Sequence, residues 1–192
     1  MMRPANGPVL FTERLLLRVP MAEDLDAWAE FAAESETMRF IGGARSRAEA
    51  WRDLCQMAGA WSIRGYAMFS VIERGTGRWV GRIGPWMPDG WPGTEVGWAV
   101  SAAFAGRGYA HEAAVATMDY AVDVLGWSEV IHTTAPDNAP SIRLAERLGS
   151  TNGGPVPLPP PHVGLRVDAW GQSADEWRSR RRDQPAARSS LG

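Results

Sequence analysis

Hydrophobic residues recur along the chain with two different periods, and each period predicts one kind of element. Apolar side chains three or four positions apart predict helices at 22–35, 46–65, 109–126 and 139–149. Short runs rich in β-branched and aromatic residues, bounded by Gly, Pro and Asp, predict strands. These runs occupy 10–19, 66–73, 78–86, 94–100, 129–134 and 163–170.

The order of these elements predicts a mixed α/β domain. One strand is followed by two helices, then by three strands expected to form an antiparallel meander, then by helix, strand, helix and strand. In the second helix, Trp51, Leu54, Ala58 and Trp61 are expected to share the face that packs on the core. Segment 153–161, GGPVPLPPP, is too rich in proline for a helix or a central strand, so we expect an extended loop there.

The length of 192 residues suits one domain, which we expect to span residues 1–178. Residues 179–192 are basic and have almost no large apolar side chains. A segment of this composition cannot bury an apolar face. We therefore expect a disordered tail that contributes neither to the fold nor to activity.

Composition and charge exclude several classes of function. The formal net charge of −2 and a pI near 5.9 give no general attraction to nucleic acid. Cys55 is the single cysteine, which excludes an internal disulfide and a thiolate zinc site and fits a reducing compartment. No signal peptide or membrane span is recognisable. We expect a cytoplasmic protein without metal, nucleic acid or membrane partners, as a monomer or a homodimer.

The sequence AGRGYAHEA, residues 105–113, joins the strand at 94–100 to the helix that begins near Tyr109. The first N–H groups of a helix lack intrahelical partners and attract phosphate, while glycine allows an anion to come close to the backbone. The alternative is that Gly106 and Gly108 merely permit a tight turn. A nucleotide P-loop is excluded because Gly108 is followed by Tyr-Ala rather than Lys-Ser/Thr, and the glycine spacing does not fit a dinucleotide fold.

The stretch EVGWAVSAAFAGRGYAHEA, followed by PDNAPSIRLAERLG, resembles the acyl-CoA-binding core of GNAT N-acetyltransferases. The opening TERLLLR and the late WGQSADEW are similar to the RimJ/RimL-like branch of that family, which includes ribosomal-protein N-terminal acetyltransferases. The resemblance implies a mostly antiparallel sheet, flanked by helices, whose fourth and fifth strands splay apart to admit the pantetheine arm. Strand four would be 94–100 and strand five 129–134. Ala103 departs from the family, in which many members have Gln or Arg.

The resemblance also implies the cosubstrate, acetyl-CoA, and the residues that bind it. Backbone groups of strand four would pair with pantetheine, the glycine loop would hold the diphosphate, and Asn138 and Ser141 would contact the pantetheine arm and the thiolate. The residues carried over are Ala99, Val100, Ala105, Gly106, Arg107, Gly108, Tyr109, Ala110, Asn138 and Ser141.

Two catalytic residues are implied in the same way. Acetyl transfer to an amine needs a neutral nucleophile and then a proton for the departing thiolate. Glu95 would be the general base, directly or through water, and Ser141 would donate to the thiolate. The alternatives are that Glu95 faces solvent and that Ser141 caps its own helix. For His132 and His111 we expect no catalytic role, with His132 half buried and His111 facing solvent.

The expected function is acetyl transfer from acetyl-CoA to a primary amine by direct attack in a ternary complex. The acceptor would be a small molecule or a protein N-terminus, in an apolar pocket built from Trp86, Trp91, Trp98 and segment 38–43. A non-catalytic CoA-binding sensor or scaffold is the alternative. The sequence does not identify the amine.

Overall fold

The computed structural model describes residues 7–183 and 190–191, and these form one mixed sheet flanked by helices. The sheet order is β7-β8-β6-β5-β4-β3-β2-β1-β9. The strands are β1 (Leu10–Phe11), β2 (Leu15–Arg18), β3 (Phe69–Glu73), β4 (Trp79–Trp86), β5 (Glu95–Val100), β6 (Glu129–Thr134), β7 (Thr151–Val156), β8 (Val167–Ser173) and β9 (Ser190–Leu191). The helices are η1 (Ala22–Asp24), α1 (Leu25–Ala32), α2 (Ser35–Met38), α3 (Arg47–Arg64), η2 (Ala102–Phe104), α4 (Tyr109–Asp119), η3 (Tyr120–Val124), α5 (Ala139–Leu148) and α6 (Ala174–Asp183).

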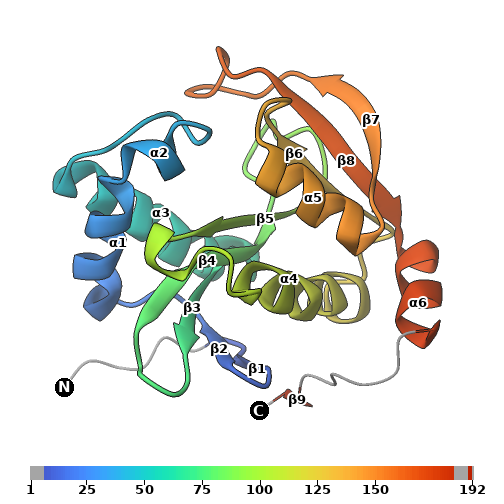
Figure 1. Cartoon of the computed structure of the whole chain (residues 1–192), viewed down its shortest axis with the longest axis horizontal. Helices are drawn as coiled ribbons and strands as arrows, with labels where there is room; N and C mark the ends of the chain where they lie inside the picture. Colours follow the sequence, from blue (N-terminus) through green and yellow to red (C-terminus); the bar gives the residue numbers. More distant parts are fainter. Residues whose placement is uncertain (1–6, 184–189, 192) are drawn as a thin grey trace.

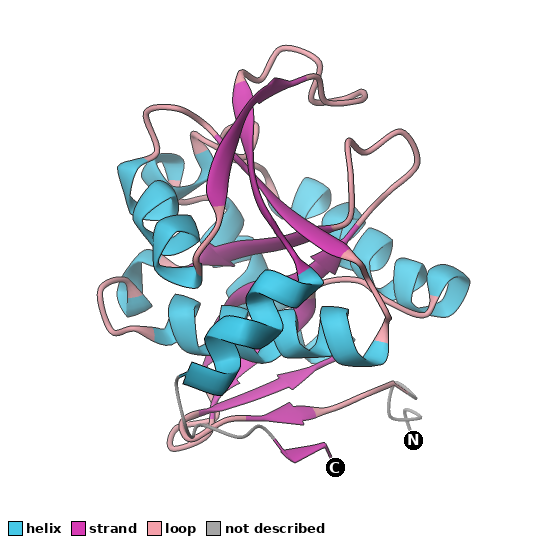
Figure 2. Cartoon of the chain, turned by 90° about the vertical axis from the view of Figure 1, so that its right-hand side faces the viewer, coloured by secondary structure: helices cyan, strands magenta, loops and turns pink. Residues whose placement is uncertain are grey.

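The expected fold class and the expected meander are confirmed. Strands β3, β4 and β5 pair antiparallel in sequence order, and among the described strands only the β5–β6 pair is parallel. Figures 1 and 2 show helices on both sides of a strongly twisted sheet, with α1 and α3 on the side away from α5 and α6. The site described below lies where β5 and β6 meet, near the middle of the sheet.

Helix α3 packs on the sheet through a face different from the expected one. Its buried residues are Ala50, Leu54, Met57 and Trp61. Trp51 is 47% exposed, so its expected place on the core face is wrong. The helical period was predicted correctly, but the predicted buried face is rotated about the helix axis relative to the observed one. Two tryptophans ten residues apart do not by themselves define one helical stripe.

The proline-rich segment is partly a strand, which corrects the expected loop. Residues Thr151–Val156 form β7, paired antiparallel with β8 with a register shift between Asn152 and Pro155. Proline is tolerated there because β7 lies at the end of the sheet order, where its missing N–H breaks no ladder. The loop therefore begins only after Val156, and β8 starts at Val167 rather than at the expected 163.

Other expected elements are subdivided. The first strand is a hairpin of β1 and β2, closed by a hydrogen bond from Thr12 N to Leu15 O, 2.9 Å. The first helix is split into η1, α1 and the short α2, and the helix expected at 109–126 ends in a π-helical turn, η3. Helix α6 runs to Asp183, so the domain boundary expected at residue 178 falls inside it, and Arg181 forms an ion pair with Asp119. Residues 184–189 and 192 of the expected tail lie outside the described residues.

Candidate active site

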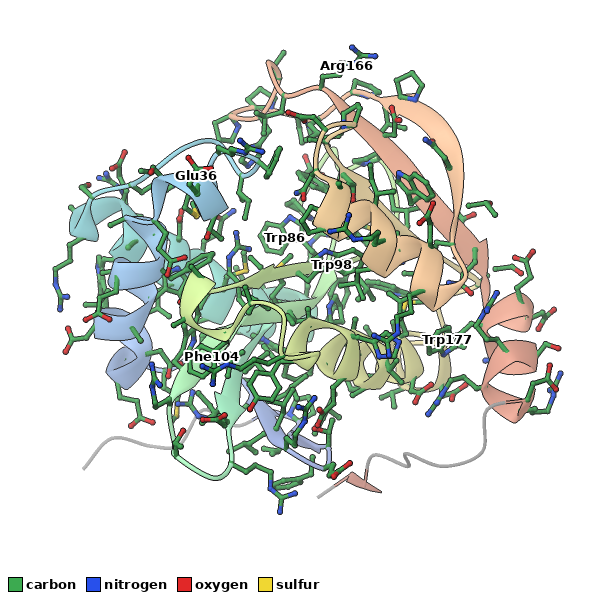
Figure 3. The ribbon with its side chains drawn as sticks, in the orientation of Figure 1. Glu36, Trp86, Trp98, Phe104, Arg166 and Trp177 are labelled. Carbon is green, nitrogen blue, oxygen red and sulfur yellow. The ribbon has the colours of Figure 1, made fainter. Side chains whose placement is uncertain are left out.

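A single cavity of about 840 Å³ contains nearly all of the residues that the sequence marked as functional. Glu95 and every predicted acetyl-CoA contact except Arg107 line it. The volume lies at the upper end of the range for small-ligand pockets. Figure 3 shows Trp86 and Trp98 in the middle of the molecule, between α2 and α5, where this cavity opens.

The cavity exists because β5 and β6 separate. Within the described residues the two strands share one registered pair, Glu95 with Ile131, supported by a hydrogen bond of 2.9 Å from Ile131 N to Thr94 O. Beyond that pair the edge of β5 toward Val100 is not covered by β6. Unpaired backbone N–H and C=O groups along such an edge can pair with an extended, amide-bearing ligand, as an added strand does.

His132 occupies the point where the two strands part. It is 1% exposed, so the expectation of half burial is wrong, and burial lowers its pKa to about 4. The neutral ring donates through Nδ1 to Val96 O, 2.7 Å, and accepts at Nε2 from the Ser150 hydroxyl, 3.0 Å. The imidazole of His132 thus donates to the Val96 carbonyl of β5. If the two strands stayed paired, a backbone N–H would make that hydrogen bond instead. His111, expected to face solvent, is partly buried.

The glycine loop begins after η2 and ends at the N-terminus of α4. Gly106 and Gly108 have φ of +74° and +80°, the left-handed region that favours glycine, and Gly108 is the N-cap of α4. An added Cβ at Gly106 would meet no atom within 4 Å. The loop is therefore open on the outside, with the free N–H groups of the first turn of α4 behind it.

Arg107 and Tyr109 have other contacts in this structure. The guanidinium of Arg107 lies 5.3 Å from the centre of the Phe104 ring, and its carbonyl accepts a hydrogen bond from Arg14, 3.0 Å. Arg107 does not line the cavity. Tyr109 is buried, and its hydroxyl donates to Glu73. The side chain of Tyr109 therefore anchors the start of α4, and the residue also lines the cavity at that helix end.

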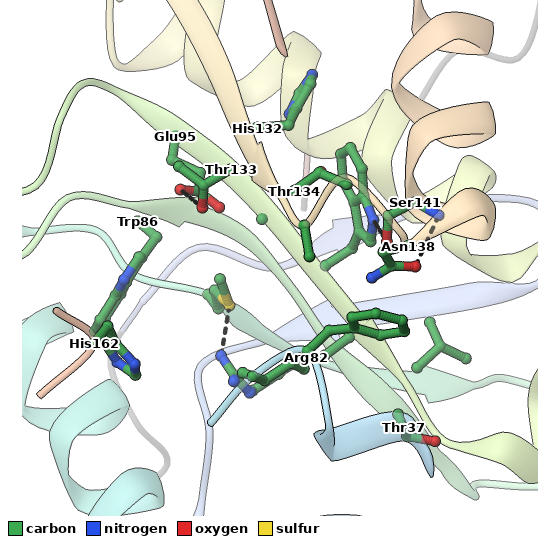
Figure 4. A pocket seen from close by; sticks show the side chains of 18 of the residues that line it. Thr37, Arg82, Trp86, Glu95, His132, Thr133, Thr134, Asn138, Ser141 and His162 are labelled. Carbon is green, nitrogen blue, oxygen red and sulfur yellow. Dashed lines mark hydrogen bonds between the residues drawn. The ribbon is translucent and has the colours of Figure 1, made fainter. Parts of the chain in front are cut away.

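Ser141 and Asn138 lie at the N-terminus of α5, facing the gap between the strands (Figure 4). Asn138 is the N-cap, and its Oδ1 accepts from Ser141 N at 3.3 Å. The Ser141 hydroxyl does not cap the helix: its oxygen accepts from Trp98 Nε1 at 3.2 Å. With the oxygen engaged as an acceptor, the Ser141 O–H hydrogen is available to donate into the cavity.

Glu95 is buried rather than solvent-facing, with 5% of its surface exposed. Its Oε2 accepts two hydrogen bonds, from Trp91 Nε1 at 2.6 Å and from the Thr133 hydroxyl at 2.8 Å. Burial nevertheless raises the pKa of Glu95 to about 7, and the hydrogen bonds from Trp91 and Thr133 only partly offset this effect. Oε1 accepts no side-chain hydrogen bond among the described residues. It lies beside Gly97, because a Cβ added at Gly97 would be 2.9 Å from this oxygen.

The far wall of the cavity is aromatic and proline-rich. Trp86 and Trp91 meet edge to face with ring centres 6.4 Å apart, and Trp91 meets His162 in the same way at 6.1 Å. Segment 158–162 lines the cavity, and an added Cβ at Gly90 would contact Pro159 at 3.3 Å. The proline segment that follows β7 thus closes the end of the cavity opposite the glycine loop.

Comparisons with known proteins identify the fold and the family. A family model for the Acetyltransferase (GNAT) domain matches residues 14–151. The chain belongs to the GNAT acetyltransferase family. It is 31% identical over 142 residues to the uncharacterized N-acetyltransferase p20 of Bacillus licheniformis, which covers 72% of this chain and 80% of that protein.

Solved GNAT structures agree with this assignment. An acetyltransferase from Agrobacterium tumefaciens str. C58 superposes with a TM-score of 0.74 at 31% identity, covering 86% of this chain and 94% of that one. RimJ of Mycobacterium smegmatis, solved in complex with CoA-disulfide, has a TM-score of 0.70 at 19% identity over 91% of each chain and therefore shares the fold. The family and its named N-acetyltransferases make this chain an acetyl-CoA-dependent acyltransferase rather than a non-catalytic binding protein.

The cavity of this GNAT chain fits acetyl-CoA on its own geometry. It joins an uncovered strand edge to an open glycine loop at a helix N-terminus, which suits an elongated molecule with amides at one end and a diphosphate at the other. Within residues 7–183 and 190–191, no group of three or more His, Cys, Asp or Glu is placed to hold a metal ion. In the same part of the chain, no helix has both the length and the apolar character that crossing a bilayer demands.

Sequence reasoning missed several residues of this GNAT site. Thr133 holds the carboxylate of Glu95, and Arg82 of β4 lines the cavity as a buried cation. Trp91 was expected in the acceptor pocket, but its hydrogen bond to Glu95 was not. The composition of strand β4 could have indicated Arg82, because a charged residue within an otherwise uncharged, buried strand is unusual. No local pattern marks Thr133, since its role depends on the pairing of β5 with β6.

Proposed function

We propose that this GNAT enzyme acetylates a primary amine by direct attack within a ternary complex of acetyl-CoA, acceptor and protein. The observation that carries the proposal is that one cavity joins the glycine loop, the separated strands and a buried carboxylate with a pKa of about 7. Acetyl-CoA, when bound, supplies an activated acetyl group on a thiol leaving group. Membership of the RimJ/RimL-like branch is part of the proposal, supported by the similarity of TERLLLR and WGQSADEW to that branch.

Glu95 is proposed as the general base. A carboxylate whose pKa is close to neutral accepts a proton from an ammonium more readily than an ordinary carboxylate and is still substantially ionised at pH 7. The two bonds to Oε2 fix the group, while Oε1 lies beside Gly97, which also lines the cavity. This arrangement leaves one oxygen to take the proton of the acceptor nitrogen, directly or through one water.

Ser141 is proposed as the donor to the departing thiolate. The bond from Trp98 to the Ser141 oxygen leaves the O–H as the remaining donor, and Asn138 holds the start of α5 in place. On the opposite side, Ala99 and Val100 are proposed to pair with the pantetheine amides. The backbone of residues 105–110 is proposed to bind the diphosphate.

An acetylation screen with mass-spectrometric detection tests the proposal. Purified enzyme and acetyl-CoA are mixed with small amines, amino acids, polyamines and N-terminal peptides, and initial rates are then measured with both substrates varied. Direct attack predicts intersecting lines in double-reciprocal plots. Parallel lines, which indicate an acetylated enzyme, would contradict it.

The proposed part of Ser141 has a more specific test. Ser141→Ala should lower turnover with acetyl-CoA by about 10²-fold, the lower end of the range for general acid–base groups. The loss should shrink with an acetyl donor whose leaving thiol is more acidic, because that thiolate needs less help to depart. An equal loss with both donors would assign Ser141 to positioning rather than to proton donation.

A further inference from the structure

Arg82, on β4, is a buried cation whose charge has no carboxylate partner. It is 9% exposed, and its one side-chain hydrogen bond among the described residues goes from Nη1 to Met68 Sδ, 3.0 Å. None of the ion pairs found within the described residues includes it. A thioether sulfur is a weak acceptor. Arg82 lines the cavity, where Figure 4 shows its guanidinium, and the other guanidinium donors have no hydrogen bond within the described residues.

The neighbouring carboxylates, Asp53 and Glu95, do not form an ion pair with Arg82. Asp53 is the carboxylate with the largest effect on Arg82, but it is already bound to Arg45 in an ion pair. Glu95 also acts on Arg82 as an opposite charge, but the two side chains form no ion pair, so within the described residues no carboxylate contacts the guanidinium. Burial lowers the pKa of Arg82 to about 10, so the group is still charged at neutral pH. A buried charge without a contacting partner is costly, and the carboxylate of a ligand would supply that partner.

Arg82 and Glu95 border the same part of the cavity. In the antiparallel pairing of β4 with β5, Arg82 lies opposite Ala99, and Trp86 lies opposite Glu95. Side chains at even spacing on a strand share one face, and all four of these residues line the cavity. Figure 4 shows the guanidinium of Arg82 and the carboxylate of Glu95 around one open region, with Trp86 and His162 at its side.

We propose that Arg82 binds a carboxylate of the acceptor, and that the acceptor is a small molecule carrying both an amine and a carboxylate. The inference rests on the proposed function, since it places the amine of that molecule at Glu95. The planar guanidinium fork matches a carboxylate and binds it through two parallel hydrogen bonds. The same charge repels polyamines, which carry only cationic groups.

The test compares acceptors that differ only in the carboxylate. Amino acids and ω-amino acids are each paired with their carboxamides, with rates corrected for the fraction of neutral amine. The wild-type enzyme should prefer the carboxylates by about tenfold to a hundredfold in kcat/KM, the scale of a hydrogen bond to a charged group. Arg82→Met should abolish this preference, whereas Arg64→Met, at an exposed position at the end of α3, should retain it.

Further measurements separate the possible failures. The thermal midpoint of Arg82→Met should be no lower than that of wild type, because the change removes a buried charge that forms no ion pair. Arg82→Lys keeps the charge but loses the guanidinium fork, so its preference for carboxylates over carboxamides should be intermediate. Equal rates with acids and amides would overturn the inference while leaving the proposed function intact. Peptides with an acidic second residue are tested as additional acceptors. If they react faster than every amino acid, the inference that the acceptor is a small molecule is overturned. Acetyl-CoA binding without transfer to any amine would instead contradict the proposed function.

Discussion

Glu95 and His132 are buried titratable groups on neighbouring strands, and burial shifts their pKa values in opposite directions. The pKa of Glu95 rises from 4.5 to about 7, and that of His132 falls from 6.5 to about 4. Both shifts disfavour the charged form, as desolvation requires. Their effects on stability therefore have opposite signs in overlapping pH windows.

The sign for each residue follows from where the proton is bound. Between pH 4.5 and 7 the folded state holds a proton on Glu95 that the unfolded state has released, so Glu95 lowers stability as the pH rises. Between pH 4 and 6.5 the unfolded state holds a proton on His132 that the folded state excludes, so His132 lowers stability as the pH falls. In the wild type the two slopes offset each other over much of this range.

We predict that Glu95→Gln removes this compensation. From pH 4.5 to pH 7 the free energy of unfolding of this variant should rise relative to that of wild type by about 3 kcal/mol, because the raised pKa of Glu95 no longer penalises the ionised form. Urea unfolding at several pH values measures this difference. Glu129→Gln, a change at an exposed residue at the start of β6, serves as the matched control. Parallel curves for wild type and Glu95→Gln would show that Glu95 is not titrating in a buried site.

At the scale of the element, the glycine loop depends on backbone conformation rather than on side chains. Gly108 is both the left-handed N-cap of α4 and part of the cavity lining. A side chain there would impose strain and would also obstruct the approach of a phosphate. Substituting a glycine of similar φ outside the cavity imposes the backbone strain alone, which separates the two effects.

Gly108→Val is therefore predicted to abolish CoA binding, whereas Gly77→Val should not. Gly77 has φ of +71° in the exposed turn between β3 and β4, away from the cavity, so its substitution carries a similar backbone penalty. Isothermal titration with CoA decides between them, with thermal unfolding of both variants as the check on folding. Normal CoA binding by a folded Gly108→Val variant would show that the diphosphate binds elsewhere.

The elements most accurately predicted from the sequence are those with local signals. The capping box of Ser46 and Glu49 marks the start of α3, and the glycine loop, the Asn138 cap and the meander follow from short patterns. The face of α3 was wrong because the burial of Trp51 depends on what lies beside it. The strand β7 was missed because proline disfavours strands in general, whereas its place at the edge of the sheet is a property of the whole topology.

The same distinction applies to the candidate site. Glu95, Ser141 and the loop residues lie in motifs and could be named in advance. The burial of His132, the hydrogen bonds that hold Glu95 and the unpaired charge of Arg82 arise from contacts between segments far apart in the chain, such as Glu95 with Thr133. Such contacts are fixed by pairing register, so the local sequence does not reveal them, although a charged residue within the apolar strand β4 was a signal for Arg82 itself.

At the scale of the whole molecule, the separation of β5 and β6 joins two halves of the cavity with different chemistry. The half beside α4 and α5 offers backbone donors and the Ser141 hydroxyl. The half between β4, the turn after Trp86 and the proline-rich segment is lined by aromatic and charged side chains, including Glu95 and Arg82. The uncovered strand edge connects them, so a cosubstrate and an acceptor can enter from opposite ends and meet at Glu95.

The most direct test of this account is the pH dependence of kcat/KM for the acceptor at saturating acetyl-CoA. For wild type we predict a rise with an apparent pKa near 7 as Glu95 ionises, in addition to any rise from the amine itself at higher pH. Glu95→Gln should lose the ionisation near 7 and fall in rate by about 10²- to 10⁴-fold, with CoA affinity unchanged. A Glu95→Gln enzyme with the rate and the pH profile of wild type would contradict the account.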